Sequence, residues 1–278
     1  MMSPWPPMQL DLTLGQAVRQ GADLLEREGV DAPRLTAEVL LAHALGKDRT
    51  YLIAHSTDRL SELAWIHYGR WLHERMGGKP TQYITRQQEF YGRPFHVEPG
   101  VLIPRPETEH LIEAVLALPS IEEPIVDVGT GSGCIAITLA LELKRTVFAV
   151  DIARRALEIA RGNAQQLGAD VRLLEGDLLT AVGSAALVVS NPPYVPAGDQ
   201  LEREVRDWEP GLALFGGDDG LDVWRRLVPQ AARVLTPGGW LIGEIDARAE
   251  MAPLFDGWRE FQVLPDLAGR PRIVRARR

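Results

Sequence analysis

The chain of 278 residues lacks the features that mark secreted, membrane-spanning and metal-binding proteins. Cys134 is its single cysteine, so no intramolecular disulfide can form, which suits a reducing compartment. No apolar run approaches the ~18 residues needed to cross a bilayer, and the opening stretch MMSPWPPMQLDL has no basic region followed by an apolar one, as a secretory signal would. The six histidines have neither cysteine partners nor ligand spacing. We therefore expect a soluble cytoplasmic protein that binds no metal and no membrane.

An excess of positive charge is also missing. The formal net charge is −8, and no basic stretch is interleaved with aromatic residues. The last ten residues, GRPRIVRARR, are basic, but their alternation indicates an edge strand with a short tail. A direct nucleic-acid substrate is therefore not expected.

Helical patterns fill the first 80 residues. Thr13 and Gln16 form a predicted capping box, and apolar residues then recur at helical spacing up to Gly29. Similar helical segments span 33–46 and 61–78, each ending in glycine. The pattern predicts a small N-terminal helical bundle over residues 1–80.

The remainder of the chain changes from helical to mixed patterning. Residues 81–106 alternate apolar and polar side chains around a turn at 92–94, which predicts a β-hairpin linker. From residue 107 to 278 apolar strands alternate with helices, so we expect an α/β fold, a doubly wound Rossmann-like sheet that is mostly parallel. Two antiparallel strands are expected at its edge over 259–278. The predicted parallel strands are 124–129, 145–151, 171–177, 186–193 and 238–245.

A glycine-rich turn, DVGTGSGC, follows the first predicted strand of this sheet. Its G-x-G-x-G spacing differs from the G-x-G-x-x-G of dinucleotide sites and suits a nucleoside with a short charged tail, such as S-adenosyl-L-methionine. Asp151 ends the second strand, where a carboxylate can accept both ribose hydroxyl hydrogens. Asp177 ends the third strand and can reach the adenine edge, although a helix cap is the alternative. The predicted cofactor site comprises Gly129, Thr130, Gly131, Ser132, Gly133, Asp151 and Asp177.

The fourth strand ends in the stretch VVSNPPY, a stiff and polar corner beside the same cleft. The Asn191 side-chain oxygen and the Pro192 carbonyl can accept both N–H bonds of a planar amide, and proline keeps that carbonyl aimed. The nitrogen lone pair then faces an activated methyl group, and the Tyr194 ring can exclude water. We predict that Asn191, Pro192 and Tyr194 are catalytic and that Pro193 joins them in binding substrate, with Asn191 also beside the cofactor. The alternative is a turn in which Asn191 is a cap and the prolines merely end the strand.

The sequence resembles the HemK/PrmC-type protein-(glutamine-N5) methyltransferases. The resemblance covers nearly the whole chain and is carried by IPRPETE, DVGTGSGCIAI, AVDIARRALEIARGNA, VVSNPPYV, EPGLAL and PDLAGRPRIV. It implies methyl transfer from S-adenosyl-L-methionine to the glutamine of the Gly-Gly-Gln loop in peptide chain release factors. It further implies that Leu178 lines the adenine and that the helical bundle helps to recognise the release factor. Arg105 and Glu107 are implied to lie over the cleft near the substrate, and the alternative for them is a surface ion pair near a linker. One departure is Asp246, where the family usually has glycine.

Two other functions remain open at this point. An amino-group methyltransferase acting on adenine or guanine in nucleic acid would use the same corner chemistry, but the negative net charge argues against it. A non-enzymatic protein that senses the cofactor would not need the complete Asn191–Tyr194 corner. We expect a monomer, with release factors as the protein partner.

Overall fold

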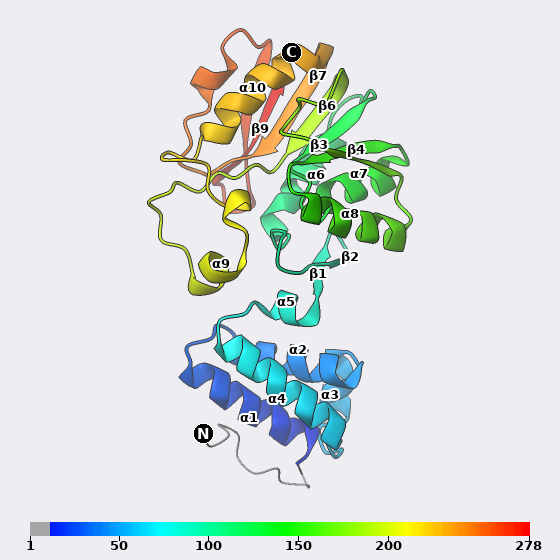
Figure 1. Cartoon of the computed structure of the whole chain (residues 1–278), viewed down its shortest axis with the longest axis vertical. Coiled ribbons are helices and arrows are strands. Elements are labelled where there is room, and N and C mark those ends of the chain that lie inside the picture. The colour runs from blue at the N-terminus through cyan, green and yellow to red at the C-terminus, as the bar shows by residue number, and fades with distance from the viewer. Residues whose placement is uncertain (1–11) are drawn as a thin grey trace. The chain divides into compact units, whose positions relative to one another are not determined.

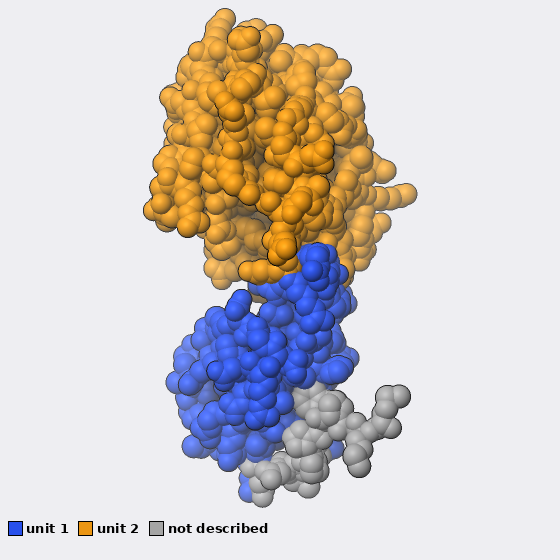
Figure 2. Space-filling view, turned by 90° about the vertical axis from the view of Figure 1, so that its left-hand side faces the viewer, with its two compact units in different colours: residues 1–86, 203–208 blue, residues 87–202, 209–278 orange. Residues whose placement is uncertain are grey.

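The computed structural model describes residues 12–278, which form two compact units. Unit 1 contains the chain through Arg86 together with residues 203–208, and unit 2 contains 87–202 and 209–278 (Figure 2). The expectation that the chain lacks a secretory signal rests on residues 1–12, and 1–11 lie outside the described residues. The predicted domain boundaries, after residue 80 and after residue 106, stay predictions. None of the described helices is both long and apolar enough to span a membrane.

Unit 1 is a helical bundle. The predicted capping box is present at its first helix, since Thr13 Oγ1 accepts from the Gln16 backbone and the Gln16 side chain accepts from the Thr13 backbone. The buried face of this helix includes Val18 and Leu25, as the apolar spacing predicts, and Tyr68 is fully buried against it. The helices are α1 (Leu14–Arg27), α2 (Pro33–Leu45), α3 (Arg49–Ala54), α4 (Glu62–Met76), α5 (Thr81–Thr85) and α9 (Arg203–Trp208).

Helix α9 is distant in sequence from the other helices of unit 1. Arg75, whose side chain is 9% exposed, forms an ion pair of 2.6 Å with Glu204. The Lys79 ammonium lies over the Trp208 ring, 5.7 Å from its centroid, within the range of a cation–π interaction. These contacts explain why residues 203–208 belong to unit 1 although the chain on both sides of them belongs to unit 2.

Unit 2 is a doubly wound α/β unit with a seven-stranded sheet in the order β5-β4-β3-β6-β7-β9-β8 (Figure 1). The predicted fold class is confirmed, including the hairpin β1–β2 and the two antiparallel strands at one end of the sheet, where β9 pairs with β7 and β8 forms the edge. The strands are β1 (Gln87–Phe90), β2 (Arg93–His96), β3 (Ile125–Val128), β4 (Val147–Asp151), β5 (Val171–Glu175), β6 (Ala185–Ser190), β7 (Leu235–Glu244), β8 (Glu260–Pro265) and β9 (Pro271–Arg277). The helices are η1 (Pro106–Thr108), α6 (Glu109–Leu116), α7 (Cys134–Leu143), α8 (Arg154–Leu167), η2 (Gly211–Ala213), α10 (Asp222–Val234) and η3 (Ala252–Phe255).

Two hydrophobic clusters lie on opposite faces of this sheet. Ile125 of β3 packs into the cluster that holds α6, α7 and part of α8, whereas Val126 and Val128 pack into the cluster that holds α10 and η3. This division follows from the alternation of side chains along a strand. Both faces are therefore covered, which explains why the parallel strands read as continuous apolar runs.

The strand order reverses between β3 and β6. From β3 the chain proceeds outward to β4 and β5, and then crosses to β6 on the other side of β3. The two strands are parallel, with Val128 opposite Ser190, so their carboxyl ends lie at the same level. A reversal of this kind leaves a crevice where ligands bind in open α/β sheets.

The close packing of α1 against α4 predicts that unit 1 is sensitive to one added methyl group. A Cβ on Gly21 would lie 1.9 Å from the Tyr68 hydroxyl and 2.8 Å from the ring carbon that bears it. We expect Gly21→Ala to lower the free energy of unfolding by about 1–3 kcal/mol, because the buried ring must move. Gly69→Ala, where a Cβ meets open space, is the matched control and is expected to gain up to about 1 kcal/mol from helix propensity. Urea denaturation followed by circular dichroism measures both, and equal midpoints would contradict the expectation.

Candidate active site

A pocket of about 920 Å³ of empty space, part of it open to solvent, lies at the carboxyl ends of the central strands. Many of the predicted site residues line it, namely Gly129, Gly131, Asp151, Asp177, Leu178, Asn191 and Pro193. Thr130, Ser132, Gly133, Pro192 and Tyr194 belong to the same loops without lining the pocket. Further walls come from segments that the sequence did not assign to the site, at 100–102, 152–156 and 210–213, and from Val223 and Arg226.

The glycine-rich turn takes a left-handed backbone, as its composition predicts. Gly129 has φ 73° and Gly131 has φ 56°, values that residues with a side chain rarely adopt. The amides of Gly129 and Thr130 both donate to the Val150 carbonyl of the neighbouring strand, at 2.8 and 3.1 Å. A Cβ at either pocket-lining glycine would meet open space, so the backbone itself forms this wall and a ligand can approach it closely.

Asp151 joins the ends of two strands through its carboxylate. Oδ2 accepts from the Gly131 amide and Oδ1 from the Ala153 amide, both at 2.8 Å. Burial raises the pKa of Asp151, and these backbone hydrogen bonds oppose that shift. Each carboxylate oxygen has a second lone pair, so Asp151 can still accept from a ligand hydroxyl.

Asp127 is a buried carboxyl group beside the glycine turn that was not predicted as a site residue. Its side chain is fully buried, and Oδ2 accepts from the Thr130 hydroxyl at 2.6 Å. Oδ1 has no hydrogen-bond partner among residues 12–278. Burial raises the pKa of Asp127 to about 7, although the Thr130 hydrogen bond opposes the shift. The turn that bears the predicted cofactor glycines is therefore anchored on a group that titrates near neutrality.

The third strand contributes Asp177 and Leu178 to the pocket. No helix begins at Asp177; its carboxylate forms an ion pair with Arg226 of α10, which also lines the pocket. The helix-cap alternative is thus wrong for this residue. Leu178 adopts φ 52°, a left-handed conformation that costs on the order of 1–3 kcal/mol for a residue other than glycine. Strain of this kind, at a pocket wall, is typical of functional sites.

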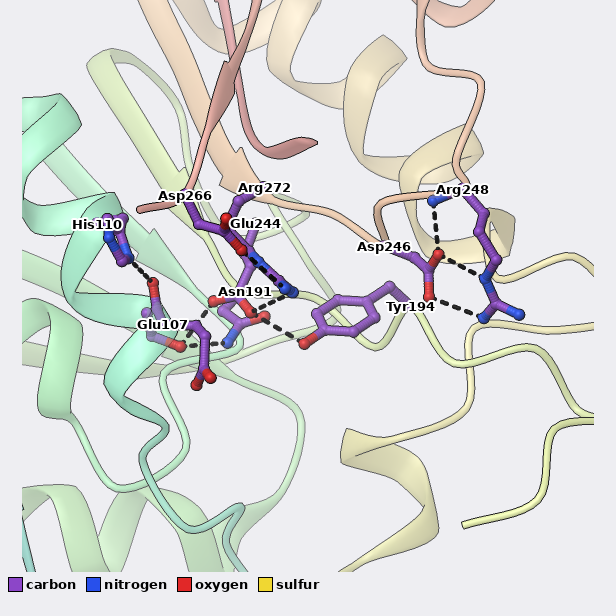
Figure 3. A network of polar contacts seen from close by, with 10 residues as sticks. Glu107, His110, Asn191, Tyr194, Glu244, Asp246, Arg248, Asp266 and Arg272 are labelled. Carbon is purple, nitrogen blue, oxygen red and sulfur yellow. Dashed lines mark hydrogen bonds and ion pairs between the residues drawn. The ribbon is translucent and has the colours of Figure 1, made fainter. Parts of the chain in front are cut away.

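The corner after β6 is held by hydrogen bonds to Thr108 and Glu244 (Figure 3). Asn191 Nδ2 donates to Thr108 Oγ1 at 3.0 Å, and the Thr108 hydroxyl donates to Glu244 Oε2 at 2.6 Å. The Tyr194 hydroxyl donates to Glu244 Oε1 at 2.9 Å. Tyr194 therefore binds the Glu244 carboxylate directly and Asn191 is linked to it through Thr108, and the sequence did not single out this carboxylate.

Glu244 ends β7 and is fully buried. Burial raises its pKa, while hydrogen bonds from Thr108 and Tyr194 and the charge of Arg272 favour the ionised form. The pKa of Tyr194 is also raised, first by burial and then by the charge of Glu244. Arg272 lies 3.9 Å from Glu244 and 3.4 Å from Asp266, so the carboxylate has a cation in reach. A proton is thus held firmly on the Tyr194 oxygen.

Arg105 and Glu107 do not pair with each other. Arg105 forms an ion pair of 2.5 Å with Glu209, a carboxylate that is 1% exposed and that also accepts from the Ile103 amide at 3.0 Å. Glu107 is exposed, and its carbonyl accepts from His110 Nδ1 at 2.9 Å. Neither residue lines the pocket. The Glu209 contacts instead tie the segments that carry two pocket walls, 100–102 and 210–213.

Asp246, the departure from the family pattern, stabilises a turn at the end of β7. Its carboxylate accepts from the Arg248 backbone and guanidinium at 2.8 Å, which lowers the pKa of Asp246. Arg248 also donates to Asp199 at 2.6 Å. Asp246, which stands in place of the usual glycine, is therefore accommodated by its ion pair with Arg248, outside the pocket.

The buried Asp127 predicts a pH-dependent stability. Its pKa is about 7 in the folded chain against an ordinary value of 3.8, so between these values the folded state binds more protons than the unfolded state. Stability therefore falls as pH rises through this window. Asp127→Asn cannot ionise, so it should remove the contribution of Asp127 to the pH dependence of the free energy of unfolding. That contribution is on the order of a few kcal/mol across the window, at about 1.36 kcal/mol per pKa unit. Urea denaturation across this window measures the slope for both proteins. Identical slopes would contradict the assignment, since Asp151 and Glu244 titrate in both.

Family comparisons place the chain among known proteins. Residues 16–85 match the family described as PrmC N-terminal domain, and residues 106–206 match the methyltransferase small domain. Two solved structures share the fold. A methyltransferase from Pyrococcus furiosus has a TM-score of 0.53 and 17% sequence identity, covering 68% of this chain and 90% of that one. The Thermus thermophilus 16S rRNA N2 G1207 methyltransferase has a TM-score of 0.54 and 21% sequence identity, covering 69% of this chain and 49% of that one. The latter was solved with AdoMet and guanosine. At these identities the likeness concerns the fold alone.

Curated relatives match the whole length of the chain. The release factor glutamine methyltransferase of Koribacter versatilis is 46% identical over 96% of this chain and 99% of its own. The protein of the same name from Moorella thermoacetica is 44% identical over 98% and 99%. The predicted resemblance is confirmed at both units, and the chain belongs to the release factor glutamine methyltransferase family.

Proposed function

We propose that the protein transfers a methyl group from S-adenosyl-L-methionine to the side-chain amide nitrogen, N5, of the glutamine in the Gly-Gly-Gln loop of peptide chain release factors. The observation that carries the proposal is that Asn191 lines the same pocket as Gly131 and Asp151. A group that can hold an amide thus lies beside a wall that suits a nucleoside cofactor. Family membership supports the same reaction.

The pocket residues fit S-adenosyl-L-methionine. When bound, this cofactor supplies an electrophilic methyl group on a sulfonium sulfur. Asp151 has free lone pairs for the ribose hydroxyls, and the open space over Gly129 and Gly131 admits the cofactor against the backbone. Ile152 and Leu212 line the pocket while 53% and 66% exposed, so apolar surface is available to pack on the adenine with Leu178. Asp177 can receive the adenine edge on the oxygen that does not face Arg226.

Asn191 and Pro192 are proposed to hold the substrate amide. An amide nitrogen is a poor nucleophile because its lone pair is delocalised. With Asn191 Nδ2 bonded to Thr108, Oδ1 is the acceptor end of the side chain, and the Pro192 carbonyl is the second acceptor. Together they fix both N–H bonds, so the lone pair is oriented before the reaction. The same acceptors stabilise positive charge as it develops on the nitrogen.

Tyr194 is proposed to pack against the substrate and exclude water. Its hydroxyl is committed to Glu244, and its raised pKa keeps it protonated, so it cannot act as a base. No strong base is required, because the nitrogen becomes acidic once it is alkylated and releases its proton afterwards. Arg105 and Glu107 are proposed to contact the rest of the substrate loop, with Arg105 held by Glu209.

Unit 1 is proposed to recognise the release factor. Its match to the PrmC N-terminal domain supports this role. We further propose that the protein is monomeric and acts in the cytoplasm, where release factors function. The predicted division into a recognition domain (1–80), a hairpin linker (81–106) and a methyltransferase domain (107–278) is kept as a proposal about independent folding.

Label transfer tests the substrate class. We expect the purified protein to transfer tritium from methyl-labelled S-adenosyl-L-methionine to a release factor, and not to DNA, tRNA or rRNA, because the corner holds an amide and the chain carries a net charge of −8. A release factor with alanine in place of the loop glutamine is the control and should take up no label. Label in nucleic acid alone would replace the proposal with the amino-group methyltransferase.

Two substitutions should separate cofactor binding from methyl transfer. Asn191→Ala is expected to lower kcat by about 100-fold to 1000-fold with a small change in cofactor affinity, since its oxygen acts on the transition state. Asp151→Ala should instead weaken cofactor binding by about 10-fold to 100-fold, through loss of hydrogen bonds to a charged acceptor. Calorimetry and steady-state kinetics measure the two effects. Parallel losses of both quantities in both variants would argue against the division of roles.

A further inference from the structure

The side chains behind Asn191 form a continuous chain of hydrogen bonds into the core of unit 2. Asn191 Nδ2 donates to Thr108 Oγ1 at 3.0 Å, and Thr108 donates to Glu244 Oε2 at 2.6 Å. Figure 3 shows Asn191 and Tyr194, both from the loop after β6, lying close to Glu244 at the end of β7. Thr108 ends η1, Asn191 follows β6, and Glu244 ends β7. Three stretches of chain thus meet at one hydroxyl group.

The direction of these hydrogen bonds follows from the chemistry of the carboxylate. An ionised Glu244 accepts hydrogen bonds and donates none, and a hydroxyl has a single hydrogen. Thr108 therefore points its hydrogen at Glu244 and offers a lone pair to Asn191. The amide of Asn191 can satisfy that lone pair only with its Nδ2 hydrogens, so Oδ1 is left at the opposite end of the amide.

Burial makes this orientation obligatory. Thr108 is 2% exposed and Glu244 is fully buried, so neither has access to bulk water as a substitute partner. A reversed Asn191 amide would place Oδ1 against the Thr108 oxygen, leaving two buried acceptors facing each other without a hydrogen. The Tyr194 hydroxyl occupies Glu244 Oε1. Burial raises the pKa of Glu244, whereas this hydrogen bond and the charge of Arg272 favour the ionised carboxylate.

We propose that Glu244 and Thr108 are positioning residues that set the orientation of the Asn191 amide, so that Oδ1 is the end available to the substrate nitrogen. The use of Oδ1 rests on the proposed function. The orientation itself is a property of the protein without substrate, and it can be measured separately.

Four variants distinguish orientation from mere packing. Thr108→Val keeps the shape but removes the lone pair, so the amide is free to turn. Glu244→Gln offers a donor to Thr108, which can then turn its own hydrogen toward Asn191 and favour the reversed amide. Thr108→Ser retains the hydroxyl and should behave as the wild type. Thr138→Val is the matched control, because Thr138 is also fully buried in unit 2 but its hydroxyl has no hydrogen-bond partner among the described residues.

Nuclear magnetic resonance tests the orientation directly. Asn163 and Asn191 are the only asparagines among the 278 residues, so 15N-asparagine labelling of the full chain yields two side-chain amide pairs. Asn163 Nδ2 donates to the carbonyls of Ser132 and His96 and serves as an internal reference. We expect Thr108→Val and Glu244→Gln to shift the Asn191 amide resonances while those of Asn163 stay in place, and Thr138→Val to move neither. Unchanged Asn191 resonances in both test variants would overturn the proposal.

Kinetics test the consequence for catalysis. With a release factor as substrate, Thr108→Val and Glu244→Gln should each lower kcat by about 10-fold to 100-fold, less than complete loss of an oriented polar group. Cofactor affinity by calorimetry should stay within about twofold, and Thr108→Ser should restore most of the turnover. If Thr108→Ser is as impaired as Thr108→Val, or if Thr138→Val is equally impaired, the effect is one of packing and the positioning role is wrong.

The two readouts also separate this inference from the proposed function. If the wild-type protein does not methylate a release factor, the proposed function fails, while the resonance shifts still decide the orientation. If the wild-type protein is active and Thr108→Val is equally active, the proposed function stands and the positioning role fails.

Discussion

The parallel register between β3 and β6 is the constraint on which the site depends. Val128 lies opposite Ser190, and the Ser190 hydroxyl donates to the Val128 carbonyl at 2.8 Å. The chain therefore leaves both strands at the same level, with Gly129 beginning one loop and Asn191 beginning the other. A slip of one residue would turn every side chain of β6 to the opposite face of the sheet. The wall that suits a cofactor and the corner that suits an amide are neighbours because this pairing holds them so.

Buried carboxylates hold in place the loops that follow the strands at their carboxyl ends. Asp151 accepts from the amides of two loops, Glu209 from Arg105 and a backbone amide, and Glu244 from two hydroxyls. Each of them joins segments that are far apart in the sequence, and each is at most 9% exposed. A buried carboxylate is costly unless its lone pairs are satisfied. A shift of one of these loops would separate a buried carboxylate from its donors and leave its lone pairs unsatisfied.

Much of this arrangement could be predicted from the sequence because it depends on local signals. Glycine spacing after a strand, an acid at the end of the next strand and a proline corner each specify structure within a few residues. Thr108, Glu209 and Glu244 could not be found in this way, since their hydrogen bonds span 50 to 136 residues. Their stretches stood out only through the family resemblance, which marks a motif as unusual without telling which side chain meets which. The same limit applies to α9, whose pattern alone does not reveal that it packs in unit 1.

Helix α9 has a consequence for how the protein can be dissected. Because 203–208 belongs to unit 1, the backbone passes between the two units three times, at Arg86, Glu202 and Trp208. Cutting the chain after Arg86 would leave the six residues of α9 in unit 2, where Glu204 and Trp208 would have lost their partners Arg75 and Lys79. To produce unit 2 as a separate fragment, residues 203–208 would have to be replaced by a short polar linker that joins the chain just before Glu209. For the same reason, a simple end-to-end fusion could not transfer unit 1 to another protein, because unit 1 is built from two separate stretches of the chain.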